Sequence, residues 1–163
     1  MEEILIRPAT LADLPVLLRF EQGVITAERP FNPTIRPGDI NYYNIPGMIE
    51  ADHIHLLVAE ERGELIASGY ARIEPADRHY LTYSQRGYLG FMYTDPAHRG
   101  KGVNQRIVAA LEEWAASRGI VELVLDVYFD NEPAIRAYEK AGFMRHLITM
   151  RKPVDGVTAP RSS

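Results

Sequence analysis

A short loop rich in glycine and basic residues is the first segment of this sequence that could do chemistry. It reads His98-Arg99-Gly100-Lys101-Gly102-Val103 and lies between a β-prone run and a helical pattern. The N–H groups of a helix's first turn lack partners within the helix, and they would point out of such a loop. Glycine lets a backbone approach an anion closely, and Arg99 and Lys101 add positive charge. The loop favours phosphate binding, with a tight turn carrying two solvated cations as the alternative.

Two other phosphate-binding motifs do not fit this loop. A P-loop needs a glycine five residues before its Gly-Lys pair and a Ser or Thr after it, but Asp95 and Gly102 stand there. The dinucleotide-binding fingerprint needs a third glycine where Gln105 stands. The loop is therefore neither of these motifs.

A second segment, residues 126–143, reads as a strand end, a turn, a short helix and the start of another strand. Pro133 suits the first turn of that helix, and Gly142 suits the position just past its end. From residue type alone, Asn131 reads as a helix cap and Tyr138 as a core residue whose hydroxyl finds a backbone partner.

In their order and spacing, the two segments together resemble the GCN5-related N-acetyltransferase family over about residues 88–150. The family's Arg-x-x-Gly-x-Gly/Ala loop falls on Arg99, Gly102 and Asn104, and Asn104 departs from its last position. The resemblance implies acetyl-CoA as a co-substrate, no metal, and a single α/β domain with a mixed, splayed β-sheet flanked by helices. The residues that it assigns to the cofactor are Met92, Tyr93, Thr94, Arg99, Gly100, Lys101, Gly102, Val103, Asn104 and Asn131.

The resemblance also implies a reaction and a proton donor for it. It places Tyr138 beside the cofactor's sulfur, where the phenol can protonate the departing thiolate. An amine is mostly protonated at neutral pH, so a base or a desolvating pocket must help it lose a proton. Attack on the thioester builds an oxyanion, which N–H groups of the splayed strand can stabilise.

The general base is the position at which the resemblance fails. Many relatives carry a glutamate on the strand before the loop, and Gly90 occupies that position here. We expect Glu74 to take this role, facing the gap at Gly90 across neighbouring strands and acting through a water. Glu28, Tyr88 and His79 border the same expected cleft and are further candidates.

The elements that must position these residues alternate between strands and helices. Hydrophobic patterning predicts strands at 4–6, 55–60, 65–73, 88–94, 121–127 and 143–150. It predicts helices from Leu14 to Ile25, opened by a capping box of Thr10 and Asp13, and from Val103 to Trp114. A third helix runs from Pro133 to Ala141. Gly90 indicates a bulge, and the strands flanking the middle helix should be parallel.

A segment rich in proline, glycine and aromatic residues separates the first helix from the second strand. Its prolines and glycines exclude a regular helix through residues 29–47. Long irregular segments inside compact domains often bind ligands. We expect residues 28–45, with Phe31, Tyr42 and Tyr43, to form the wall of the acceptor site.

The length, composition and net charge of the whole chain limit the class of protein to which it can belong. Its 163 residues, 46% hydrophobic and 25% charged, suit one globular domain, here residues 1–154, followed by an unstructured tail at 155–163. A net charge of −4 disfavours nucleic acid, and the absence of cysteine excludes a thiolate nucleophile or a disulfide scaffold. Without a long apolar run or a signal-like start, we expect a soluble cytoplasmic protein that does not bind membranes. The sequence leaves open whether the protein forms a homodimer.

These observations favour an N-acetyltransferase that acts on a primary amine of a small molecule or peptide. The alternatives are a non-catalytic acyl-CoA-binding or sensing module that has lost its base, and a structural relative without a ligand. The identity of the acceptor cannot be read from the sequence.

Overall fold

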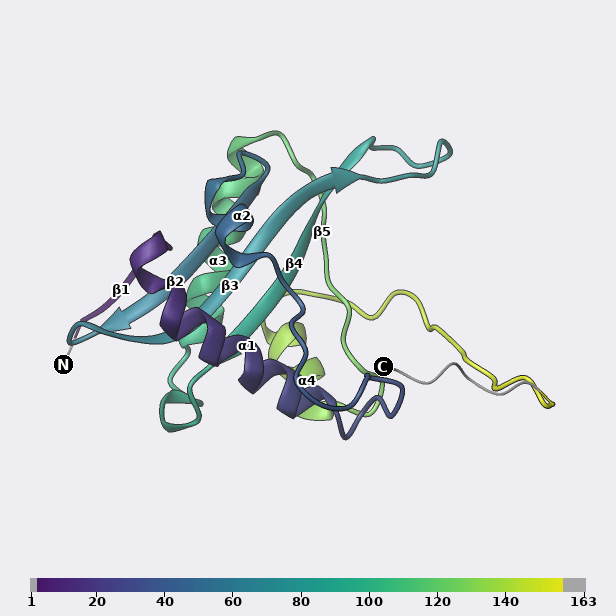
Figure 1. The fold of residues 1–163 in the computed structure, drawn as a ribbon. Helices are drawn as coiled ribbons and strands as arrows, with labels where there is room; N and C mark the ends of the chain where they lie inside the picture. The colour runs from purple at the N-terminus through teal and green to yellow at the C-terminus, as the bar shows by residue number, and fades with distance from the viewer. Residues whose placement is uncertain (1–2, 157–163) are drawn as a thin grey trace.

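The computed structural model describes residues 3–156 as one sheet with helices packed on both of its sides (Figure 1). Its elements, in chain order, are β1 (Ile4–Pro8), η1 (Leu11–Asp13), α1 (Leu14–Glu28), α2 (Ile45–Glu50), β2 (Ile54–Glu61), β3 (Glu64–Pro75), β4 (Gln85–Thr94), η2 (Pro96–His98), α3 (Val103–Ser117), β5 (Leu123–Val124) and α4 (Glu132–Lys140). The η elements are single 3₁₀ turns. Of the tail predicted at 155–163, residues 157–163 lie outside the described residues.

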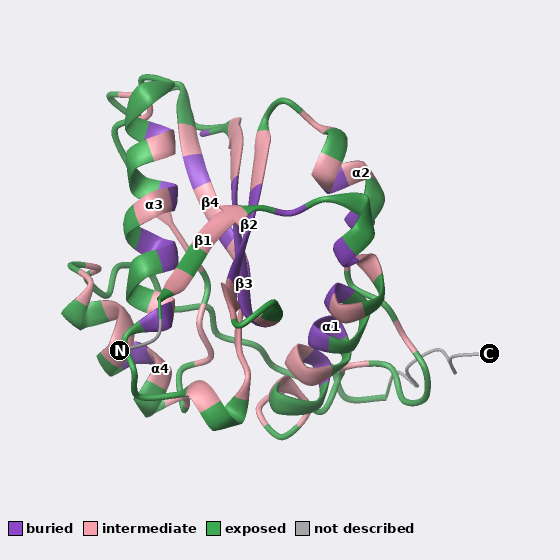
Figure 2. Cartoon of the chain, turned by 90° about the vertical axis from the view of Figure 1, so that its left-hand side faces the viewer, coloured by how far each residue is buried: buried purple, intermediate pink, exposed green. Residues whose placement is uncertain are grey.

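The five strands follow one another across the sheet in chain order, β1-β2-β3-β4-β5. The first four pair antiparallel, whereas β4 and β5 pair parallel through the α3 crossover. Figure 2 shows α3 and α4 on one side of the sheet and α1 and α2 on the other. The single α/β domain with an open, mixed sheet is thus confirmed.

Two apolar clusters hold these layers together, one on each side of the sheet. Val103, Ile107 and Leu111 of α3 are buried against one side, and Leu17 and Phe20 of α1 are buried against the other. Side chains alternate between the two faces of a strand, so each buried strand contributes to both clusters. Within residues 3–156 no helix has the length and the hydropathy that crossing a membrane requires.

The start of the first helix confirms the predicted capping box in a tighter form. The Thr10 N–H donates to Asp13 Oδ2 at 2.8 Å, and Asp13 is buried in a bidentate pair with Arg7. The Arg7 guanidinium holds the pKa of Asp13 below its usual range. The first turn is the 3₁₀ turn η1, and α1 follows it.

Three predictions about elements need correction. A short helix, α2, begins within the segment predicted to be irregular, because Asn44 caps it and proline is favoured in a first turn. The strand predicted at 121–127 pairs only at Leu123 and Val124. The strand predicted at 143–150 does not form within the described part of the chain.

The segment 143–150 has the alternation of a strand but no neighbour to pair with in the described structure. Met144, Leu147 and Met150 are more than four-fifths exposed, and Figure 1 shows the chain leaving the sheet after α4. A strand needs a partner to satisfy its N–H and C=O groups. Sequence periodicity reports a segment's preference but does not supply that partner.

Candidate functional site

A bulge in β4 is the structural centre of the candidate site. The pairing of β3 with β4 shifts between Ser68 and Tyr70, so that Phe91 and Met92 together face the single residue Gly69. Phe91 has a φ of 52°, in the left-handed region that only a tertiary constraint imposes on a bulky residue. The bulge predicted near Gly90 therefore exists, one residue further along the strand.

Two buried side chains hold this bulge in place. The Ser68 hydroxyl, fully buried on β3, donates to the carbonyl oxygen of Phe91 at 3.0 Å. The Tyr43 phenol is hydrogen-bonded to the Phe91 backbone, and the two rings stack at 4.7 Å. These two side chains thereby bond to backbone groups of Phe91 that would have paired with the neighbouring strand in a regular ladder.

Beyond the bulge, β4 separates from β5. The two strands pair only at Gly87 and Tyr88, and Figure 1 shows the chain after β5 diverging from β4. Met92, Tyr93 and Thr94 therefore have no β5 residue opposite them on this edge of β4. These are the three residues expected to bind the cofactor's pantetheine arm through their backbone.

The free edge of β4 runs into the glycine loop and the start of α3. Gly100 and Gly102 have φ values of 79° and 77°, and a Cβ on either would meet no atom within 4 Å. No side chain caps α3, so the N–H groups of its first turn, beginning at Val103, are left for a ligand. Arg99 and Lys101 are exposed. This open, basic cradle fits the phosphate site expected from the sequence.

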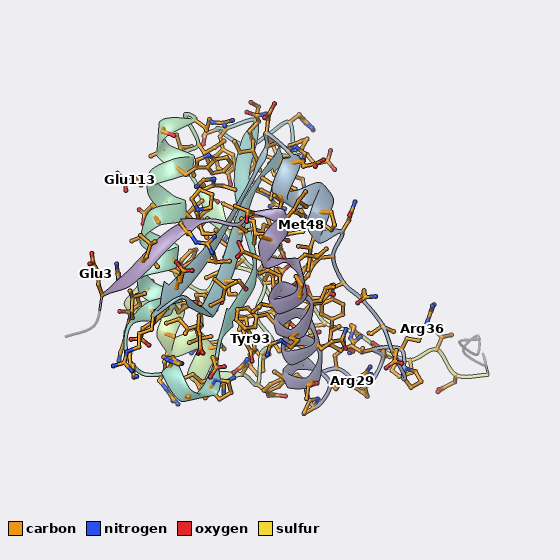
Figure 3. All side chains as sticks on the ribbon, turned by 60° about the vertical axis from the view of Figure 1, so that its left-hand side comes forward. Glu3, Arg29, Arg36, Met48, Tyr93 and Glu113 are labelled. Atoms are coloured by element: carbon orange, nitrogen blue, oxygen red, sulfur yellow. The ribbon has the colours of Figure 1, made fainter. Side chains whose placement is uncertain are left out.

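A cavity of about 390 Å³ adjoins the cradle on the side of α1. Its lining residues are Gln22, Gly23, Thr26, Ala27, Tyr93, Pro96 and Arg99. Tyr93 lies directly against α1, where its ring approaches Phe20 at 4.7 Å and leaves room for no side chain at Gly23 (Figure 3). The cavity therefore joins the cradle to the apolar wall of α1.

Helix α4 presents the two residues that were singled out in the second motif. Asn131 caps the helix by accepting from the Ala134 N–H at 3.4 Å, so its capping role is observed and its ligand role stays a prediction. Half-buried Tyr138 contacts Phe143 edge to face, but its hydroxyl makes no hydrogen bond to another described residue. Burial, and after it the charge of Glu28, raises the pKa of Tyr138 to about 12.

The irregular segment between α1 and α2 is tied down at both ends. The carboxylate of Glu21, fully buried on α1, accepts from the N–H groups of Tyr42 and Tyr43 at 2.8 and 2.7 Å. At the other end, Phe31 stacks on Tyr128 at 5.8 Å. Tyr43 is part of the core at the bulge, whereas Tyr42 remains partly exposed.

Glu74 does not face Gly90, which corrects the geometric expectation for the base. Glu74 lies opposite Arg86, while Tyr70 lies opposite Gly90. Glu74 and Tyr70 are four residues apart on β3, which is roughly 13 Å along a strand. Glu74 instead forms ion pairs with Arg72 at 3.8 Å and with Arg86 at 3.5 Å.

The position opposite Gly90 is filled by a phenol. A Cβ placed on Gly90 would collide with the Tyr70 hydroxyl oxygen, and Tyr70 is buried. Tyr88, also a candidate for the base, donates to Asp126 at 3.0 Å. His79 packs on Tyr80 in the exposed loop between β3 and β4. Neither Tyr88 nor His79 approaches the bulge as Tyr70 does.

Sequence reasoning missed Glu21 and Ser68, although one signal for Glu21 was present. Glu21 lies four residues after Leu17 and four before Ile25, in the middle of the apolar stripe of α1. An acidic residue in such a stripe indicates a buried partner, because an unpaired buried charge is costly. Ser68 carries no comparable signal, because a buried serine in a strand fits many roles.

A family model described as the acetyltransferase (GNAT) family matches residues 23–143. Glucosamine 6-phosphate N-acetyltransferase 1 from rice (Oryza sativa subsp. japonica) is 29% identical over 149 residues, covering 89% of this chain and 84% of its own length. Mycothiol acetyltransferase from Amycolatopsis mediterranei is 32% identical over 58% of this chain and 32% of its own length.

Among solved structures, a tetramutant of the BH1408 protein from Bacillus halodurans superposes with a TM-score of 0.81 and 24% identity. The match covers 92% of this chain and 99% of that one. At this identity the likeness concerns the fold alone. The chain spans between about a third and a half of the length of the first three curated relatives that it matches.

Removing the Glu21 carboxylate should release the segment that it holds. We expect Glu21→Ala to lower the free energy of unfolding by about 1.5–3 kcal/mol, the usual value of a hydrogen bond to a charged group. Amide hydrogen exchange at Tyr42 and Tyr43 should speed up. Gln22→Ala, which removes an exposed bond to the Ile40 carbonyl, is the control and should change stability by no more than about 0.5 kcal/mol. Unchanged exchange in Glu21→Ala would contradict this role.

Adding one methyl group at Gly90 should be destabilising. Gly90→Ala pushes a Cβ into the Tyr70 phenol, and overpacking of this kind costs about 1–3 kcal/mol. Urea unfolding of Gly90→Ala, Tyr70→Ala and the double variant measures the coupling. The double variant should lose less stability than the sum of the two single changes. Strict additivity would show that the close approach has no energetic consequence.

Proposed function

The chain belongs to the acetyltransferase (GNAT) family, and from this premise we propose that it transfers an acetyl group from acetyl-CoA to a primary amine of a small molecule or peptide. The relatives' names point to amine acceptors among small molecules. A cytoplasmic location and a homodimer stay predictions.

One observation carries this proposal: the free edge of β4 ends directly at the open glycine cradle of α3. A phosphate held on the cradle by Arg99, Lys101 and the first-turn N–H groups would leave its attached chain lying along Met92–Thr94. The thioester end would then reach the bulge at Phe91. The residues present thus fit acetyl-CoA in charge and in free hydrogen-bonding groups.

The chain's own groups can perform each part of the reaction. N–H groups on the free edge of β4 stabilise the oxyanion that forms when an amine attacks the thioester. Tyr138 donates its proton to the departing sulfur, and with a pKa of about 12 it remains protonated over the physiological range. Asn131 orients the arm that lies beside α4.

A non-catalytic acyl-CoA-binding or sensing module would bind CoA on the same cradle but would not transfer its acetyl group. Steady release of free CoA thiol in the presence of an amine separates the two functions. A screen of amines, polyamines, amino acids and peptide N-termini by thiol release would identify the acceptor. Binding of CoA without any thiol release would support the module instead.

The cradle assignment predicts two variants with weaker CoA binding. Arg99→Ala should raise the Kd for CoA about tenfold, through loss of a charge-assisted phosphate contact. Gly102→Asp should raise it more, because it places an anion in the cradle and strains a backbone with positive φ. Isothermal calorimetry at moderate salt measures both. Arg118→Ala, which removes an arginine at the far end of α3, is the matched control, and equal affinities in all four proteins would refute the cradle.

The role of Tyr138 predicts a loss in turnover without a loss in binding. Tyr138→Phe keeps the ring contact with Phe143 and removes the proton donor, so kcat should fall by about 10²-fold, the lower end for general acid catalysis. The Kd for CoA and the melting temperature should remain those of the parent. Tyr80→Phe in the exposed loop is the control. A lowered melting temperature with kcat within about twofold would identify Tyr138 as a packing residue only.

A further inference from the structure

The side chain of Glu28 lies among tyrosines that come from separate segments. Glu28 is the last residue of α1 and is half-buried. The Tyr42 hydroxyl is hydrogen-bonded to its carboxylate. Its charge also acts on Tyr43 and on Tyr138 of α4. Glu28 therefore lies between the irregular segment and the helix that carries the proposed proton donor.

This carboxylate lacks a cationic partner. None of the ion pairs among the described residues includes Glu28, and Arg29 next to it donates instead to the carbonyl oxygens of Arg36 and Gly38. Figure 3 shows Arg29, at the end of α1, and Arg36, in the irregular segment that follows, in the same region of the molecule. Burial raises the pKa of Glu28, and the bond from Tyr42 only partly offsets it. A half-buried carboxylate in this state favours a ligand that brings a positive charge.

The surroundings of Glu28 match an ammonium group on an apolar framework. Phe31 and Tyr128 stack on each other near Tyr42, and aromatic faces attract cations. The Glu21 carboxylate fixes the backbone of Tyr42 and Tyr43, so the position of the Tyr42 phenol against Glu28 is set by α1 itself. The site is therefore held in place before any ligand arrives.

We propose that Glu28, oriented by Tyr42, binds the acceptor amine in its ammonium form and removes its proton. This inference rests on the proposed acetyl transfer, and it names the substrate class as primary amines that are protonated in solution. It also gives the reaction the base that Gly90 cannot supply. The charge of the same carboxylate acts on Tyr138, the proposed proton donor.

The proton and bond changes balance with these two residues. The ammonium passes one proton to Glu28, and the neutral nitrogen forms a bond to the thioester carbonyl carbon. The C–S bond breaks with its electron pair on sulfur, and Tyr138 protonates that sulfur. The acylated nitrogen returns its second proton to the Tyr138 phenolate, and Glu28 releases its own to solvent. One amide, one thiol and one free proton result.

Glu74 is less suited to this role because its charge is already paired. It is held by Arg72 and Arg86, and it lies four residues along β3 from the residue opposite Gly90. The two guanidinium groups occupy the side of the carboxylate at which an ammonium ligand would have to bind. Glu28 has no such ion pair among the described residues, and burial raises its pKa, which favours proton uptake.

Replacing Glu28 should separate function from stability. A carboxyl whose pKa is raised on folding contributes stability below its ordinary pKa, and this contribution is lost as the pH rises through the raised value. At pH 7.5 the ionised Glu28 therefore costs stability, and Glu28→Gln should keep or raise the melting temperature. Any loss of activity in this variant then cannot be ascribed to unfolding.

The deciding experiment compares two probes of the same shape without turnover. Phenethylamine is cationic at pH 7.5, and phenethyl alcohol is neutral. In the free protein we expect the amine to bind at least tenfold more tightly by ligand-observed NMR, and Glu28→Gln to abolish the difference. The amine's affinity in the parent should fall as the pH is lowered through the raised pKa of Glu28, and Glu28→Gln should lose this dependence. Glu113→Gln, exposed on α3, is the matched control (Figure 3).

Turnover provides a second readout that is independent of the first. With phenethylamine and acetyl-CoA, Glu28→Gln should lower kcat/KM for the amine by about 10²-fold or more and leave the Kd for CoA within twofold. An unchanged preference for the amine in Glu28→Gln overturns the inference, as does a loss of the preference in Glu74→Gln alone. Failure of CoA to bind the parent protein would instead count against the proposed function.

Discussion

The bulge at Phe91 is the constraint on which the remaining site depends. The bulge interrupts the pairing of β4 with β3, and β4 pairs with β5 only before it, at Gly87 and Tyr88. The extra residue breaks the ladder, and the Ser68 hydroxyl and the Tyr43 phenol satisfy the groups that the break exposes. Because the buried partners hold a left-handed Phe91, the strained backbone persists without a ligand. The edge of β4 beyond it then runs to the cradle at Gly100 and Gly102.

The proposed cofactor groove and the proposed acceptor segment both contact α1. Its inner face carries Phe20 and Gly23 against Tyr93, beside the free edge of β4. Glu21 on the same helix holds Tyr42 and Tyr43, and Glu28 ends the helix beside them. One helix therefore sets the distance between the proposed cofactor groove and the proposed acceptor segment. The two N–H groups that donate to the fully buried Glu21 carboxylate offset part of its desolvation cost.

The phenol opposite Gly90 has a direct chemical consequence. Tyr70 fills the volume there, so β4 cannot present a carboxylate at this position without displacing a buried ring. A base for the amine must then come from another element that reaches the bulge. Among the described acidic residues, Glu74 is paired with arginines, whereas the charge of Glu28 acts on Tyr43 at the bulge and on Tyr138 of α4. The proposed acetyl transfer can thus draw its base from a different part of the fold.

The sequence by itself determined the capping box, the glycine loop before α3, most of the strands and long helices, and the presence of a bulge, because each is encoded within a few residues. Hydrophobic period, glycine placement and helix-cap residues act locally, so they can be read locally. Only the tertiary structure decided that β4 pairs Gly90 with Tyr70, that Glu74 lies opposite Arg86, and that residues 143–150 have no strand beside them among the described residues. Strand register and the burial of Glu21 depend on packing between residues far apart in the chain. No local pattern contains that information, since a one-residue shift in register changes which side chains meet.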